Sequence, residues 1–318
     1  MRVDIPSISR QLTEEEVFGI INKNFSQLIN SWFNFQMEWL KGTYSVFKDH
    51  DKYMIIIYLV NKTMNFFSDN LITLDYEKYY LKRKIEISNF NIINISKDLL
   101  ISKETARRKV LELEKIGVLK RGKKKIILDR SKLGFQKPVR SIENISSFLS
   151  KFSEVVQKNA VINKKYSKDF IQSYIRKNFT HCWKLFYEMQ IPLILNWKKT
   201  FGDFETWHIW GIIVTQNSFK NIKNSNLIIN REKLIEGMFS KNGIGINAMS
   251  VSDLSGIPRA TVVRKINSLL KKKLILVDEK KLYHPGKIEL KKYVDLNKNA
   301  IQLLSIFSCK MLNLLKLN

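Results

Sequence analysis

The sequence predicts a mainly α-helical protein with small β-hairpins, built as two similar units in tandem. Apolar residues recur at helical spacing over long stretches, which favours amphipathic helices. Glycine and proline are scarce, at 12 and 5 of 318 residues, which argues against an all-β fold with many tight turns. The order of the segments repeats after about 155 residues, which indicates an internal duplication.

Each unit is expected to begin with a long amphipathic helix, at residues 13–47 and 167–200. Thr13 and Glu16 form a capping box at the first start, and apolar residues then follow at steps of three and four. This seam consists of Phe18, Ile21, Phe25, Leu28, Trp32, Phe35 and Trp39. An offset of 154 carries most of it onto Ile175, Phe179, Cys182, Phe186, Met189 and Leu193. We interpret the seam as packing residues.

The later segments keep their order in both units, while the offset grows from 154 to 156. The expected elements are an apolar helix at 51–67 and 204–219, a short helix near Asp75 and Asn230, a helix–turn–helix stretch at 95–110 and 251–266, a hairpin, and a closing helix at 141–158 and 296–316. Segments 129–140 and 159–166 are polar and are interpreted as linkers. The units are therefore 1–158 and 159–318.

The helix–turn–helix stretches contain the most informative residues. In the second copy Gly256 supplies a permissive turn residue, and Pro258 stands at the first position of the second helix, where its missing N–H is no loss. In the first copy Leu100 and Ser102 occupy these places. The turn is less ideal there, and Ser102 is expected to cap the helix instead.

The second helix of each stretch has one apolar and one polar face. The residues expected to pack inward are Ala106, Val110, Leu113 and Gly117 in the first copy and Val262, Ile266 and Leu269 in the second. At 100° per residue, Arg108 and Arg264 point away from that side, with Thr105 and Thr261 nearby. Arginine can pair with guanine or phosphate, and threonine with phosphate or a thymine methyl group.

A β-hairpin is expected after each of these helices. The first spans residues 120–128 with Gly122 in the turn, and its tip is strongly basic. The second spans residues 276–284 and carries Asp278 and Glu279, so we expect it to bind a polyanion more weakly.

Together these residues resemble the winged helix-turn-helix family of bacterial transcription regulators. The second copy matches through residues 256–265, Leu269, Leu274 and Ile275. The first copy matches at Thr105, Arg108, Lys109, Leu113, Gly117, Val118 and Leu119, and departs at the Gly-Ile-Pro triplet. The flanking helices are similar to the MarR-type arrangement, where they build the dimer interface. The resemblance implies sequence-specific binding of double-stranded DNA, often with a small-molecule effector.

The charge agrees with a nucleic-acid partner, since the net charge is +26 and the sequence pI is about 9.9. The expected DNA-binding residues are Lys103, Thr105, Arg107, Arg108, Lys109, Lys120, Arg121, Lys123, Lys124, Lys125, Arg259, Thr261, Arg264, Lys265, Lys280 and Lys281. The two units are expected to form an intramolecular pseudo-dimer, with the whole chain acting as a monomer or a homodimer.

No enzyme, cofactor or metal site is expected. The four histidines are scattered, no phosphate-binding loop is present, and Cys182 and Cys309 lack metal-ligand spacing. The longest apolar run, residues 53–60, is far too short for a membrane span. We therefore expect a cytoplasmic protein associated with the nucleoid.

Two other functions remain open. A plasmid-type replication initiator also combines tandem winged helices with a basic surface, although its two units usually differ more than these do. A winged-helix protein-interaction module would not need Arg108, Arg264 or a basic hairpin.

Overall fold

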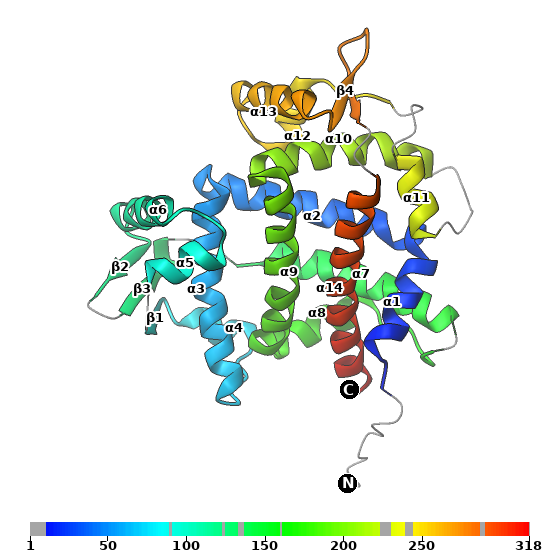
Figure 1. Ribbon diagram of the computed structural model, residues 1–318. Coiled ribbons are helices and arrows are strands. Elements are labelled where there is room, and N and C mark those ends of the chain that lie inside the picture. The colour runs from blue at the N-terminus through cyan, green and yellow to red at the C-terminus, as the bar shows by residue number, and fades with distance from the viewer. Residues whose placement is uncertain are drawn as a thin grey trace.

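The computed structural model describes residues 11–88, 91–122, 125–132, 137–159, 161–222, 230–238, 244–286 and 290–317. The chain is mainly α-helical with small antiparallel sheets, as predicted (Figure 1). The first half contains α1 (Glu14–Lys23), α2 (Phe25–Phe47), α3 (His50–Asp69), α4 (Tyr76–Leu81), β1 (Lys84–Ser88), α5 (Ile92–Asp98), α6 (Lys103–Lys115), β2 (Leu119–Arg121), β3 (Lys125–Asp129), the 3₁₀ helix η2 (Arg130–Lys132) and α7 (Val139–Lys158). The second half contains α8 (Lys168–Lys177), α9 (Phe179–Phe201), α10 (Phe204–Ile222), α11 (Arg231–Met238), α12 (Ala248–Ser255), α13 (Arg259–Lys271), β4 (Ile275–Val277), β5 (Tyr283–Pro285) and α14 (Leu290–Lys316).

The prediction of a single long helix at the start of each half is wrong, because each of these helices is broken once. The breaks fall at Asn24 and Asn178, leaving helices of 10 and 23 residues in each half. The Asn24 Nδ2 donates to the Ile20 carbonyl (2.9 Å) and the Asn178 Nδ2 to the Tyr174 carbonyl (3.2 Å). An asparagine side chain that occupies a carbonyl of the preceding turn competes with the helical ladder. The seam continues across both breaks and is buried, with Phe18 partly buried.

The hairpins are confirmed, and the first belongs to a larger sheet. β3 lies between β1 and β2 in an antiparallel sheet of order β1-β3-β2, and β4 pairs with β5. The sequence analysis did not anticipate β1. Its Ile85 and Ile87 face Leu128 and Ile126 in register, and all four are buried. In the second half Ile246 forms a single bridge to Tyr283 at the corresponding edge.

The backbone has a positive φ angle at three pairs of corresponding positions in the two halves. In each case one half has a glycine and the other a larger residue, so the turn is set by the fold rather than by glycine alone. Gly117, expected on the inner face of its helix, instead lies in such a turn beyond the helix end. The pairs, with their φ angles, are Lys48 (54°) and Gly202 (91°), Leu100 (53°) and Gly256 (71°), and Gly117 (74°) and Lys273 (56°).

The two halves are packed crosswise. α10, α11 and α12 of the second half lie on α2 of the first, while α3 and α4 of the first lie on α9 of the second (Figure 1). Gly211 of α10 allows the closest approach, because a Cβ there would stand 2.7 Å from the Met37 sulfur. The closing helices also cross over, α14 onto α1 and α7 onto α8.

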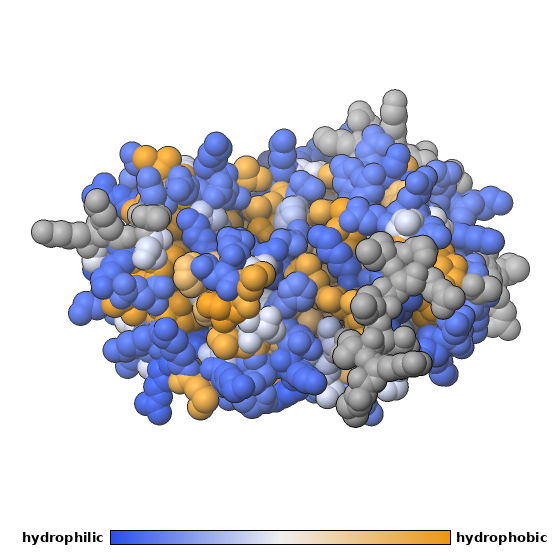
Figure 2. Space-filling model, turned by 90° about the horizontal axis from the view of Figure 1, so that it is seen from below, coloured by the Kyte–Doolittle hydropathy of each residue, from blue (hydrophilic) through white to orange (hydrophobic). Residues whose placement is uncertain are grey.

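None of the described helices combines the length and the apolar content needed to cross a membrane. The face in Figure 2 is mostly hydrophilic, interrupted by smaller apolar groups. Exposed apolar side chains such as Leu71, Leu81 and Phe66 are normal on a folded protein when they occur in small numbers.

A reciprocal pair of amide hydrogen bonds joins α2 to α9. The Gln36 Nε2 donates to the Gln190 Oε1 (3.0 Å), and the Gln190 Nε2 donates to the Gln36 Oε1 (2.9 Å). Both residues are buried, with 2 % and 0 % of their surface exposed. The two positions are 154 apart, the offset of the repeat. Two like residues that bond each other reciprocally have the contact pattern of a two-fold axis.

The amide pair should show strong coupling in a double-mutant cycle. Gln36→Leu or Gln190→Leu alone leaves one buried amide without a partner, so each should lower the free energy of unfolding by about 1–3 kcal/mol. The double variant should cost clearly less than the sum, because no amide is then orphaned. Urea unfolding measures all three, with Gln157→Leu, whose bond to Asn163 is exposed, as the control. Additive losses would contradict the reciprocal bond.

Candidate nucleic-acid interface

The two helix–turn–helix segments, α5–α6 and α12–α13, form as predicted and share their local hydrogen bonds. The Ser96 Oγ donates to the Ile101 carbonyl and the Ser252 Oγ to the Ile257 carbonyl, both at 2.7 Å, which closes each turn in the same way. Ser102 caps α6, since its Oγ accepts the Thr105 N–H at 3.0 Å. Pro258 lies at the N-cap of α13, one residue before the predicted place.

The second helix of each segment buries its predicted apolar face. Ala106, Val110 and Leu113 of α6 are fully buried, as are Val262, Ile266 and Leu269 of α13. Arg108 and Arg264 are exposed on the other side, while Thr105 and Thr261 are half-buried. The Thr105 hydroxyl already accepts a hydrogen bond from Ser102 (2.8 Å). The two arginines are therefore the outward residues at the centre of each helix.

Most other candidate residues are exposed around these helices. They are Lys103 and Arg107 on α6, Arg259 on α13, Lys120, Arg121 and Lys125 on β2 and β3, and Lys280 and Lys281 between β4 and β5. Lys123 and Lys124 lie outside the described residues. The two segments occupy separate corners of the molecule, α6 at the left of Figure 1 and α13 at the top.

Lys109 and Lys265 do not lie on the outward face, contrary to the sequence analysis. Lys109 is only 8 % exposed and its ammonium group is ion-paired with Asp49, the N-cap of α3. Lys265 is ion-paired in the same way with Asp203, directly before α10. Each lysine thus ties its helix to the start of the long helix behind it, and neither is free to contact a ligand on the outer face.

The first hairpin is less basic than its sequence suggests. Arg121 is paired with Glu114 (2.6 Å) and Lys125 with Glu86 (2.9 Å), so two of its cations already have carboxylate partners. In the second hairpin Asp278 is bonded to His284 (2.9 Å). A phosphate must compete with these contacts, which weakens the attraction of both hairpins.

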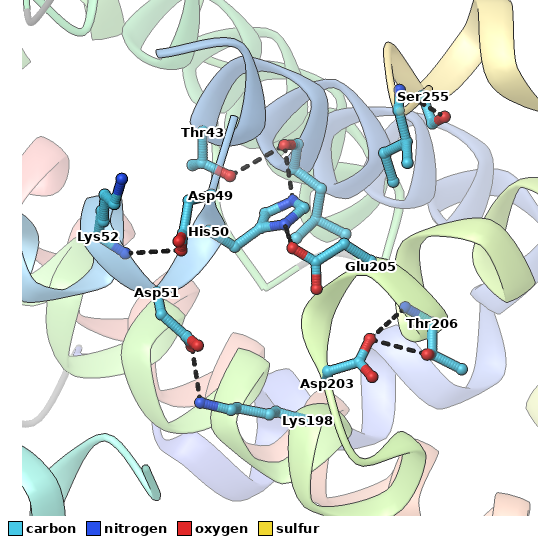
Figure 3. Close-up of polar contacts among 12 residues, drawn as sticks. Thr43, Asp49, His50, Asp51, Lys52, Lys198, Asp203, Glu205, Thr206 and Ser255 are labelled. Atoms are coloured by element: carbon cyan, nitrogen blue, oxygen red, sulfur yellow. Dashed lines mark hydrogen bonds and ion pairs between the residues drawn. The ribbon is translucent and has the colours of Figure 1, made fainter. Parts of the chain in front are cut away.

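The starts of α3 and α10 meet in a cluster of charged side chains behind the two segments (Figure 3). The Lys198 Nζ donates to Asp51 (2.8 Å) and to the Leu99 carbonyl (3.1 Å) in the turn between α5 and α6. The two nitrogens of His50 face the Glu205 carboxylate (3.1 Å) and the Leu40 carbonyl (3.2 Å). The Lys198 and Glu205 contacts cross between the halves of the chain, so they connect the turn before α6 and the start of α3 to α9 and α10.

Asp49 and Asp203 favour their charged forms although they are partly buried. Burial alone would raise the pKa of Asp49, but the hydrogen bond and charge of Lys109 and the backbone N–H of Lys52 outweigh it, and the pKa is lowered. Asp203 behaves in the same way through Lys265 and Thr206. Sequence reasoning missed Asp49 and Asp203, although the repeat offset of 154 that relates them was a usable signal.

The comparisons with known proteins add no candidate. No family model matches the chain, and neither the curated proteins nor the solved structures give a match. Among the described residues no cluster of histidine, cysteine, aspartate or glutamate could hold a metal ion.

The Asp49–Lys109 pair should make the stability depend on acid pH. Asp49→Asn keeps an N-cap residue but removes the charge, so at pH 7 it should lower the free energy of unfolding by about 1–3 kcal/mol. Because the folded-state pKa of Asp49 is depressed, its contribution is complete above the unfolded pKa of about 3.9 and disappears as the pH falls through the lower folded value.

Urea unfolding of both proteins at pH 7 and near pH 3 measures this effect. The difference in the free energy of unfolding between wild type and Asp49→Asn should be smaller at the lower pH. Asp203→Asn should lower the free energy of unfolding at pH 7 by less than Asp49→Asn does, because the Asp203 side chain is 38 % exposed and the Asp49 side chain 22 %. An unchanged gap at both pH values would rule out the ion pair as its source.

Proposed function

We propose that the chain is a sequence-specific double-stranded DNA-binding protein, a transcription regulator made of two winged-helix units that arose by internal duplication. One observation carries the proposal: two helix–turn–helix segments with the same turn and the same buried face each present an outward arginine, Arg108 and Arg264. The net charge of +26 supports a polyanionic partner.

The duplication is supported by equivalent contacts as well as by element order. Asn24 and Asn178 break corresponding helices, Ser96 and Ser252 close corresponding turns, and Lys109 and Lys265 form corresponding ion pairs. Periodicity alone explains buried seams, but it does not explain why unusual side-chain contacts recur at offsets of 154 to 156 residues.

In this proposal α6 and α13 are the recognition helices, and each enters a major groove. Arg108 and Arg264 reach base edges or phosphates, and Lys103, Arg107 and Arg259 lie on the same exposed sides. Lys109 and Lys265 hold the helices in position rather than touching DNA. The hairpins act as wings beside the phosphate backbone. In the first wing, Lys120 on β2 is an exposed cation.

We further propose that the two halves act as a pseudo-dimer within one chain. Supporting this, α10 and α12 of the second half pack on α2 of the first, α3 and α4 of the first half pack on α9 of the second, and the Gln36–Gln190 pair joins α2 to α9. Two independent beads on a linker would not need such crossed packing. The two recognition helices are then expected to address major grooves one DNA turn apart, roughly 34 Å.

The two half-sites should be similar but not identical. The exposed positions Lys103 and Arg107 of α6 correspond to Arg259 and Val263 of α13. Val263 adds an apolar side chain, 37 % exposed, where the first helix has a cation. The second half-site is therefore expected to depend more on Arg264 and on apolar contact with a thymine methyl group.

Arg108→Ala and Arg264→Ala should each weaken binding to the preferred DNA site. The expected loss is about 1–3 kcal/mol for each bidentate contact to guanine, with relaxed preference at the base it reads. Fluorescence anisotropy with a duplex selected from random double-stranded DNA measures the effect. Arg140→Ala is the control, because Arg140 is an exposed arginine on α7. Unchanged affinity in both arginine variants would remove the recognition helices from the interface.

A further inference from the structure

A cavity of about 500 Å³ lies between the two halves, away from the recognition helices. Its walls come from α2 and α7 of the first half and from α10 and α12 of the second. Binding sites for small molecules commonly have volumes of roughly 300–1,000 Å³. The cavity touches α12 through Leu254, so it borders the segment that carries the second recognition helix.

Two opposite charges stand on one wall of the cavity. Glu38 and Lys41 are three residues apart on α2 and both line it, and in the part of the chain described they are not ion-paired with each other. The Glu38 carboxylate lies 3.8 Å from the Arg140 guanidinium of α7. The Lys41 Nζ donates to the Asp253 carbonyl (3.3 Å) in α12. Asn144 and Gln216 add side-chain amides from α7 and α10. The wall can therefore receive an anionic and a cationic group side by side.

The cavity also borders a buried histidine, one of whose ring nitrogens has no hydrogen-bond partner. His208 is 1 % exposed, and its Nδ1 has no hydrogen-bond partner. Burial, together with the nearby charges of His50 and Lys41, holds the pKa of His208 well below its ordinary value, so the ring is neutral. An unsatisfied buried nitrogen is uncommon in a folded protein and calls for an explanation.

Five of the lining positions have apolar counterparts in the other half. The repeat offsets carry Glu38, Lys41, Asn144, Ser147 and His208 onto Pro192, Leu195, Ala300, Leu303 and Met54. The cavity that includes Pro192 and Leu303 is lined by a different polar set, with Glu14, Glu15, Asn196, Asn299 and Gln302. Packing of the helices therefore does not require polar side chains at these five positions, and the combination of Glu38, Lys41 and His208 belongs to the cavity at α2.

We propose that this cavity binds a small zwitterion, an amino acid or a close derivative. Its carboxylate pairs with Lys41 and its ammonium group with Glu38, while the amides of Asn144 and Gln216 provide further hydrogen bonds. A molecule with only one of the two charges makes one of these ion pairs instead of two, and binds less well. The ammonium group competes with Arg140 for the Glu38 carboxylate.

Binding of the zwitterion would change the position of the segment that carries the second recognition helix. This regulatory step rests on the proposed function. A carboxylate on Lys41 competes with the Asp253 carbonyl and loosens the contact of α12 with α2. DNA and the zwitterion would then alter each other's affinity by the same factor. Because the cavity borders α12, which precedes α13, the effect falls on the half-site read by α13.

The test is calorimetric titration of the full chain, without DNA, with each of the twenty standard L-amino acids. Each binder is followed by its decarboxylated amine and its deaminated acid. At least one amino acid should bind, and both analogues should bind at least tenfold more weakly. Lys41→Met and Glu38→Gln should each weaken binding at least tenfold. Ser147→Leu should abolish it by filling the cavity with the residue of the other half. Lys158→Met and Glu154→Gln, an exposed opposite-charge pair on α7, should leave it unchanged.

Failure to bind any amino acid would overturn the site, as would equal binding by the Ser147→Leu variant. The regulatory step is tested separately, by the anisotropy assay with and without the amino acid that binds. Equal DNA affinity would overturn that step alone. Absence of DNA binding under all conditions would count against the proposed function and would leave the calorimetric result standing.

Discussion

The reciprocal hydrogen bonds between Gln36 and Gln190 are the constraint on which the arrangement of the two halves depends. Both amides are buried, and each satisfies the other. A slip of α2 along α9 by one turn would orphan both, at about 1–3 kcal/mol for each unsatisfied group. Apolar side chains tolerate many registers, whereas a single polar pair specifies one, as buried asparagines do in coiled coils. The pair thus sets the register of the crossed helices.

The positions of the recognition segments follow from that register. With α2 and α9 fixed, α10 and α12 pack across the halves on α2, and α3 and α4 pack across them on α9. The starts of α3 and α10 then meet (Figure 3). Asp49 and Asp203 form ion pairs with the inner lysines of α6 and α13, Lys109 and Lys265. Lys198 adds a contact across the halves to the turn before α6. In our account these ion pairs determine how the outward arginines are presented.

Local features could be predicted from the sequence because they depend on neighbours in the chain. The seam, the capping box at Thr13, the cap at Ser102 and the outward direction of Arg108 all follow from helical periodicity and capping chemistry. Periodicity could not show the break at Asn24, because the seam residues on either side of it, Ile21 and Phe25, keep the ordinary helical spacing of four.

The features that the sequence did not reveal depend on distant partners. Lys109 adjoins the buried Val110 on the helix, and only Asp49, sixty positions away, decides that it points inward. β1 pairs with a strand about forty residues later, beyond any local pattern. The cavity at Lys41 and His208 needs four helices from both halves before it exists. The repeat offset identifies corresponding residues in the two halves, but it does not show which residues are in contact in the folded chain.

The central claim is that one chain presents two recognition helices to adjacent major grooves. Light scattering of the complex, combined with a hydroxyl-radical footprint on the selected duplex, tests it most directly. Our account predicts one chain on each duplex and protection of two major grooves about one helical turn apart. Protection of a single groove by one chain, or of four grooves by an obligate dimer, would contradict it.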